Sequence, residues 1–242
     1  TMKAYLSALA PAARLTVWKT LLIALGAAAV QAVLFFLTLS RWGGETPLIL
    51  ESLIQEGRLS LVFAAGLLLV CGALVLPGWD RGAKTGYTIR RLAVNEGKLS
   101  LLWGVQNALL LFFYWVCQMA AVLVLGVYFL SCADPATVSH QSLLLACYRS
   151  PYLHSLLPLA DWLVLLRNLS GCLVLGLAAA AFCHHRRHGR TSPLILPLAV
   201  VAAVGFPVYA GNPVLSISVT VIFLLLCLYF WKSVTGVSED EE

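Results

Sequence analysis

Charged residues are scarce in this chain. Only 11% of its 242 residues are Asp, Glu, Lys or Arg, whereas 60% are hydrophobic. A soluble domain usually carries about 25% charged residues, because it needs a hydrated surface. The scarcity excludes an ordinary soluble domain, and the mean hydropathy of +0.88 favours a chain whose solvent is a lipid bilayer.

Long apolar runs are what the sequence does contain. Hydropathy predicts six membrane spans, each close to the roughly 20 residues needed to cross about 30 Å of hydrocarbon. The predicted spans cover residues 15–39, 59–77, 99–131, 162–183, 192–210 and 213–231. We therefore expect an all-α polytopic membrane protein that forms a single transmembrane domain over residues 1–242.

Basic residues are distributed unevenly between the predicted loops. If the N-terminus lies inside, the outer loops hold Arg41, Arg58 and Arg149. The cytoplasmic set is then Lys3, Arg14, Lys19, Arg81, Lys84, Arg90, Arg91, Lys98, Arg186, Arg187, Arg190 and Lys232. Because cytoplasmic loops carry an excess of Lys and Arg, the pattern predicts cytoplasmic termini, a cytoplasmic loop at 78–98 and an outer loop at 132–161.

The stretch from Gly78 to Thr85 reads G-W-D-R-G-A-K-T, which is close to a nucleotide-binding phosphate loop. Such a loop needs a glycine directly before its lysine, because the backbone there approaches the phosphate too closely for a Cβ. Ala83 occupies that position. The apolar run before the stretch is also too long for a buried strand. We expect no nucleotide site, no cofactor and no enzymatic activity in this chain.

What remains is a basic loop that leads into a long helix. Thr85 can cap a short helix over residues 86–92, and Asn95 can cap the long helix, with Glu96 in its first turn. A short helix on the inner membrane face suits docking of a partner. The residues alone leave a second interpretation open, in which Arg90 and Arg91 anchor the loop to anionic lipid headgroups.

The stretches "GAKTGYTIRRLAVNEGKLSLLWGVQNALLLFFYW" and "YRSPYLHSLLPLADWLVLLRNL" resemble the permease subunits of type-2 ATP-binding-cassette (ABC) exporters from Gram-positive bacteria. The resemblance implies a multi-pass subunit of the bacterial plasma membrane that pairs with a second, identical or related permease subunit and with separate ABC ATPase subunits. It also implies a coupling helix over about Lys84–Glu96. The implied ATPase-coupling residues are Lys84, Thr85, Tyr87, Thr88, Arg90, Arg91, Leu92 and Glu96.

Other functions stay in competition with a permease. A non-transporting membrane scaffold or assembly factor is the main alternative. An intramembrane hydrolase is disfavoured, because Ser170 lacks a G-x-S-G context, no predicted span contains a histidine, and the only Glu-Glu pair is Glu241-Glu242. The sparse charge in the spans disfavours an ion pathway and leaves peptides, lipids or amphipathic drugs as cargo. The resemblance implies antimicrobial peptides in particular. We expect membrane lipids, and no nucleic acid, as further partners.

Several polar residues fall inside the predicted spans. The uncharged ones either make interhelical hydrogen bonds, worth about 0.6 kcal/mol each, or line a translocation path. They are Gln31, Gln106, Asn107 and Gln118. Arg167 is a functional candidate, because charge inside a membrane is costly. We nevertheless favour a position for it in the outer headgroup region, beside Asp161 and Trp162.

Histidines and cysteines offer weaker signals. His184 and His188 have a helical spacing that suits a metal, but only Cys183 is a nearby third ligand and three arginines repel a cation. We expect no metal and a solvated loop there. Cys132 and Cys147 bracket part of the predicted outer loop, where either a disulfide or two free thiols are compatible with an oxidising compartment.

Overall fold

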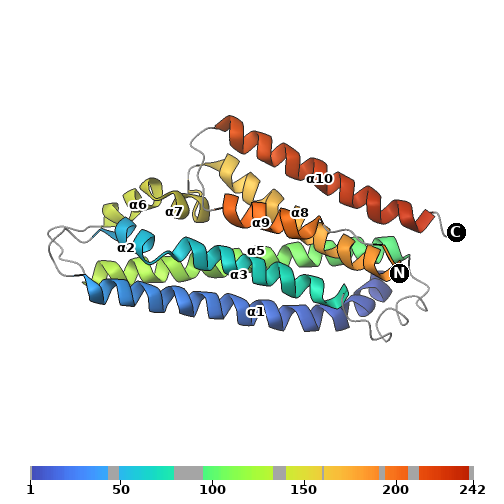
Figure 1. Ribbon diagram of the computed structural model, residues 1–242, viewed down its shortest axis with the longest axis horizontal. Helices are drawn as coiled ribbons and strands as arrows, with labels where there is room; N and C mark the ends of the chain where they lie inside the picture. Colours follow the sequence, from blue (N-terminus) through green and yellow to red (C-terminus); the bar gives the residue numbers. More distant parts are fainter. Residues whose placement is uncertain are drawn as a thin grey trace.

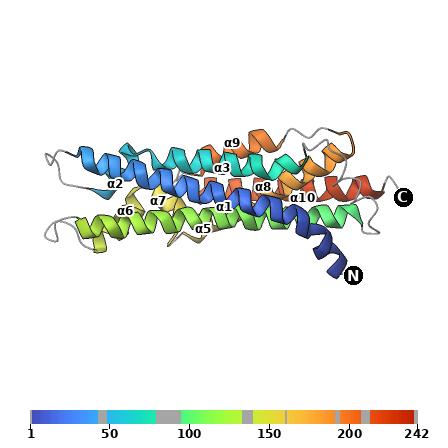
Figure 2. The same cartoon turned by 90° about the horizontal axis from the view of Figure 1, so that it is seen from below.

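The computed structural model of the chain describes residues 2–42, 49–78, 95–132, 140–159, 161–190, 194–206 and 213–239, and its regular elements there are all helical. They lie lengthwise in an elongated bundle (Figure 1). The two chain ends lie at the same end of the bundle (Figures 1 and 2), which we call the termini end, and the opposite end is the far end. The elements are α1 (Met2–Arg41), α2 (Leu50–Glu56), α3 (Leu59–Val75), the short η1 (Leu76–Gly78), α5 (Glu96–Cys132), α6 (His140–Arg149), α7 (Pro151–Leu156), α8 (Trp162–Arg187), α9 (Ile195–Gly205) and α10 (Pro213–Glu239).

Five described segments are long and apolar enough to cross a membrane. They are Thr16–Arg41, Leu59–Gly78, Glu96–Cys132, Trp162–Arg187 and Pro213–Gly236. Large apolar side chains point away from the bundle, among them Leu69, Val124 and Leu225, each at least 60% exposed. Lipid accommodates such a surface, whereas water penalises it. The chain is therefore a polytopic helical membrane protein, as its composition predicts.

Helix α8 is the most enclosed of the five membrane helices. Of the residues in its most apolar stretch 67% are buried, whereas the figure is 28% for α1 and for α10. It packs tightly on α5 through small residues. A Cβ added to Gly176 would lie only 2.5 Å from the backbone nitrogen of Ala108, and one added to Gly104 would lie 2.7 Å from Leu177. Small residues let membrane helices approach closely and gain van der Waals contact, so this pair forms the centre of the bundle.

Contacts along the helices give their directions. Ser100 near the start of α5 contacts His184 near the end of α8, so these two helices are antiparallel. Gly171 lies against Phe223, and His185 Nε2 lies 2.7 Å from Ser233 Oγ, so α8 and α10 are parallel. Because a chain that leaves one helix at its end must return before it starts a parallel one, the segment containing α9 runs back along the bundle.

The helix bounds differ from the predicted spans in several places. Helix α9 has 11 residues, which rise only about 16 Å, and the rest of the predicted span 192–210 lies mostly outside the described residues. Helix α8 continues past residue 183 to Arg187. The predicted outer loop contains the helices α6 and α7, because its apolar residues pack into the far end of the bundle.

Candidate functional site

The short helix α7 is set into the far end of the bundle. Ser150 caps it, accepting a hydrogen bond from the Leu153 backbone N–H at 3.5 Å, and Pro151 occupies its first turn, where a missing N–H costs nothing. All five residues of 152–156 are buried. A capped helix whose residues after Pro151 are all buried is a fixed part of the bundle and not a surface loop.

Polar side chains from three membrane helices hold α7 in place. Gln31 of α1 donates to the Tyr152 hydroxyl at 3.2 Å, and Trp115 of α5 donates its Nε1–H to the Leu156 carbonyl at 3.1 Å. Asn168 of α8 donates to the Ser155 carbonyl at 2.8 Å. Carbonyls near the end of a helix lack intrahelical partners, so these bonds satisfy α7 and fix its position at once.

Burial also changes the acidity of a phenol on this helix. It raises the pKa of Tyr152, and the hydrogen bond from Gln31 only partly offsets the rise. Tyr152 is therefore neutral at every physiological pH and remains able to hydrogen-bond as a phenol. A histidine follows it closely: His154 Nε2 lies 2.7 Å from Asp161 Oδ2, which ties α7 to the residue that precedes α8.

Arg167 is buried within the protein, and its predicted depth near the headgroups stays a prediction. Its side chain turns inward at the α7 contact, and the residue is only 7% exposed. The Nη2 group donates to Ser155 Oγ and to Asn168 Oδ1, both at 3.3 Å. Ser155, Arg167 and Asn168 thus form one polar cluster. Sequence spacing could not show this contact, because the residues described between α7 and α8 are not helical.

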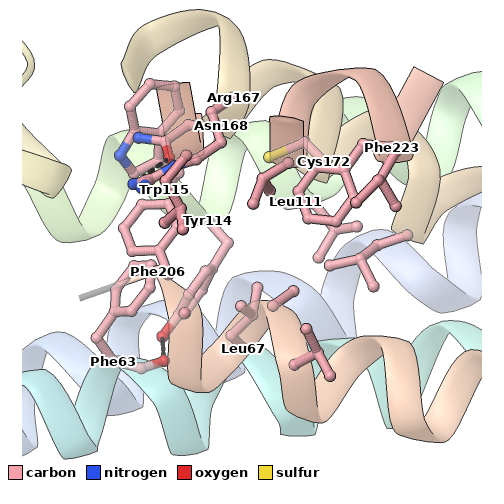
Figure 3. Close-up of a pocket in the computed structure, with 18 residues that line it drawn as sticks. Phe63, Leu67, Leu111, Tyr114, Trp115, Arg167, Asn168, Cys172, Phe206 and Phe223 are labelled. Atoms are coloured by element: carbon pink, nitrogen blue, oxygen red, sulfur yellow. Dashed lines mark hydrogen bonds between the residues drawn. The ribbon is translucent and has the colours of Figure 1, made fainter. Parts of the chain in front are cut away.

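Next to this cluster is a cavity of about 270 Å³ (Figure 3). Its wall is contributed by α3, α5, α8, α9 and α10, and by Phe206, which follows α9. The lining residues include Phe63, Leu67, Leu111, Tyr114, Trp115, Arg167, Asn168, Cys172, Phe206 and Phe223. Ligand pockets are typically apolar with a few placed polar groups, so this cavity is the candidate functional site.

The aromatic wall of the cavity is internally ordered. Phe63 and Phe206 stack with ring centroids 4.4 Å apart, and the Tyr114 hydroxyl donates to the Phe63 carbonyl at 2.9 Å. Gly66 lies against Tyr114 so closely that an added Cβ would overlap its hydroxyl. The Tyr114 ring therefore occupies a fixed place between α3 and α5, and the cavity is preformed on this side.

The four predicted path residues do not converge on this cavity. Gln31 donates to the Tyr152 hydroxyl of α7, and Gln118 donates to the Ala24 carbonyl at 2.9 Å, so both join neighbouring helices. Asn107 is fully buried, and its amide nitrogen and oxygen have no hydrogen-bond partner in the described part of the chain. Gln106 is half-buried, and its Oε1 likewise lacks a partner there. Their role in translocation stays a prediction.

A second polar cluster ties α5 to α8 at the termini end. Asn95 caps α5 by accepting from the Lys98 N–H at 3.0 Å, as predicted. Glu96 Oε1 accepts from Arg187 at 3.4 Å, and Glu96 Oε2 lies 3.5 Å from His188 Nε2. The Arg187 guanidinium also lies 5.0 Å from the Trp103 ring centre.

His184 belongs to the same cluster, which corrects the prediction of a solvated loop. Helix α8 continues past it, and the side chain is 1% exposed with Nδ1 3.2 Å from Ser100 Oγ. One ligand atom each of Glu96, His184 and His188 lies within 4.8 Å of the others, a donor set that could hold Zn²⁺. The missing third ligand type thus comes from α5. Arg187 already pairs with Glu96, and the absence of a metal stays a prediction.

The structure describes only some of the remaining predicted residues. Lys84, Thr85, Tyr87, Thr88, Arg90, Arg91 and Leu92 lie outside the described residues. Cys132 and Cys147 both carry free thiols in the structure, the first exposed and the second buried. The disulfide between them is not formed there, and the oxidised state stays a prediction.

Comparisons with protein-family models, with curated proteins and with solved structures find no match to this chain.

Proposed function

We propose that the chain is the permease subunit of a type-2 ABC exporter in a bacterial plasma membrane. In this proposal α9 and its flanking residues form a sixth crossing, so that both termini lie in the cytoplasm. The basic residues support this orientation. Lys98, Arg187 and Lys232 lie at the termini end, whereas Arg58 and Arg149 lie at the far end.

One observation carries the proposal: both ends of the predicted coupling loop are fixed to the last turns of α8. Gly78 packs on Cys183, where an added Cβ would lie 3.0 Å from Sγ, and Glu96 pairs with Arg187. A load applied to the loop between these points passes directly into α8, the helix that carries Arg167 beside the cavity. A coupling element needs such a connection to the substrate site.

The chain would pair with a second permease subunit, identical or related, and two separate ATPase subunits would dock on the loop. ATP hydrolysis would take place on those subunits, with no catalytic group in this chain. The cavity supports an amphipathic or lipidic cargo, since its wall is apolar apart from the Arg167 cluster. A scaffold without transport is the alternative that the following experiment separates.

The experiment is a charge reversal in the loop. We expect Arg90→Glu with Arg91→Glu to leave the subunit inserted, because about ten other cytoplasmic basic residues still set its orientation. Docking should fail, since like charges at a specific interface cost several kcal/mol. The measurement is co-purification of the subunit with the proposed ABC ATPase partner, together with ATPase activity in nanodiscs.

Lys84→Ala is the control for a nucleotide site, since Lys84 stands where a phosphate-binding loop carries its lysine. The purified subunit should neither bind nor hydrolyse ATP with or without this substitution. If the double reversal leaves ATPase association and transport unchanged, the coupling assignment is wrong and the lipid-anchor interpretation of Arg90 and Arg91 replaces it.

A further inference from the structure

Arg167 brings a positive charge into the protein interior and forms no ion pair with any residue that the structure describes. The ion pairs among the described residues involve other basic groups, and Arg167 bonds only to the neutral oxygens of Ser155 and Asn168. A buried charge without a counter-charge is costly, even where neutral groups hydrogen-bond to it. The fold nevertheless holds the guanidinium in place, which indicates a role for the charge itself.

The other polar groups of the cavity wall are already used within the protein. The Tyr114 hydroxyl donates to Phe63, the Trp115 Nε1–H donates to Leu156, and the Asn168 amide donates to Ser155. Among the described residues that line the cavity, Arg167 alone carries a charge. A ligand therefore meets one cation at the α7 side of an otherwise apolar chamber (Figure 3).

Three residues that line the cavity also reach the apolar outside of the bundle, from which we infer an opening toward lipid. Val201 of α9 and Leu215 and Ile222 of α10 line it, and each is more than 50% exposed on the apolar outside of the bundle. An opening between two lipid-facing helices admits molecules that are already dissolved in the membrane. It does not favour a hydrophilic ligand, which would have to cross hydrocarbon to reach it.

From these observations we propose that the cavity binds an anionic amphiphile taken from the bilayer, with its carboxylate or phosphate on Arg167 and an apolar chain between α9 and α10. The guanidinium suits both oxyanions, because its planar fork can donate two parallel hydrogen bonds. A volume of about 270 Å³ accommodates part of one acyl chain and no large headgroup. The proposal rests on the proposed permease function in that it names the ligand class of the same cavity, but its binding test needs no ATPase, so the two can fail separately.

The test uses the purified full-length subunit in nanodiscs and a brominated probe, because bromine quenches tryptophan fluorescence at short range and Trp115 lies in the wall. Dibromostearate should quench the Trp115 fluorescence with a saturable dependence on its concentration. Its methyl ester, which lacks the carboxylate, should show no saturable quenching of Trp115. Trp115→Phe keeps an aromatic ring in the wall and identifies the part of the signal that arises in the cavity. Equal affinity for the acid and the ester would overturn the proposal.

Substitutions separate the charge from the chamber. Arg167→Gln should weaken dibromostearate binding at least tenfold, and Arg149→Gln, at an exposed arginine of the far end, should leave it unchanged. Ala202→Phe keeps Arg167 but fills the chamber and should abolish binding, which keeps the test open if the Arg167 variant does not fold. An unchanged dissociation constant in both cavity variants would refute the site.

A second quenching experiment distinguishes a phospholipid from a free fatty acid as the source of the anion. Nanodiscs of dibrominated phosphatidylglycerol should quench Trp115 without added probe if a phospholipid occupies the cavity, and stearate should relieve that quenching only if a free carboxylate competes for the same place. Dibrominated phosphatidylcholine is the neutral control. Native mass spectrometry completes the set: a dimer that carries neither lipid nor fatty acid would show a second copy covering the opening and would overturn the proposal.

Discussion

At the scale of single residues, two cysteines at the far end of the molecule differ in exposure, although the sequence predicts both in the same outer loop region. Cys132, the last residue of α5, is exposed, and Cys147 on α6 is buried. Burial raises the pKa of the Cys147 thiol. Because the thiolate is the reactive form, a raised pKa moves its reaction to higher pH and lowers its rate at neutral pH.

The two thiols should therefore react at different rates. We expect a maleimide to modify Cys132 first and Cys147 at least about tenfold more slowly at pH 7, with the difference narrowing as the pH rises. Peptide mass spectrometry after timed quenching measures both rates. A cross-linked peptide of Cys132 and Cys147 from unreduced protein would instead establish the disulfide and remove the difference.

At the scale of helices, the α5–α8 contact depends on two glycines that no hydropathy plot distinguishes from others. We expect Gly176→Ala to destabilise the protein by about 1–3 kcal/mol, because its Cβ would meet the backbone of Ala108 and force the helices apart. Gly72→Ala is the matched control in α3, since nothing lies within 4 Å of its Cβ position. Thermal unfolding in detergent should separate the variants, and equal melting temperatures would contradict the close packing.

Hydropathy predicted the membrane helices well, because twenty apolar residues leave few alternatives in lipid. Hydropathy did not predict which polar side chains are buried, because contacts between distant helices decide this. His184 lies next to arginines and was expected in water, yet Ser100 and Glu96 of α5 surround it within a helix that continues. The burial of Arg167 depends on α7, which supplies one of its partners, and nothing in local composition marks residues 151–156 as a buried helix.

At the scale of the whole molecule, the parallel arrangement of α8 and α10 constrains the topology. It requires an even number of crossings between the two chain ends if the α9 segment returns through the membrane. We expect Arg149→Cys in a Cys132→Ser background to react with a membrane-impermeant maleimide on intact cells. Lys232→Cys should react only after permeabilisation. Labelling of both sites on intact cells would show that the α9 segment does not cross.

The two anchor points of the segment between η1 and α5 have a consequence for protein engineering. Cys183, which holds Gly78, and Arg187, which holds Glu96, are four residues apart on α8 and so lie one helical turn from each other. The described residues on either side of positions 79–94 are thus held at almost the same place on α8. Segments with adjacent ends tolerate replacement and changes of length with little effect on the rest of a fold. If the proposed function holds, exchanging this segment between chains of this architecture should redirect them to another ATPase while the bundle and its cavity stay unchanged.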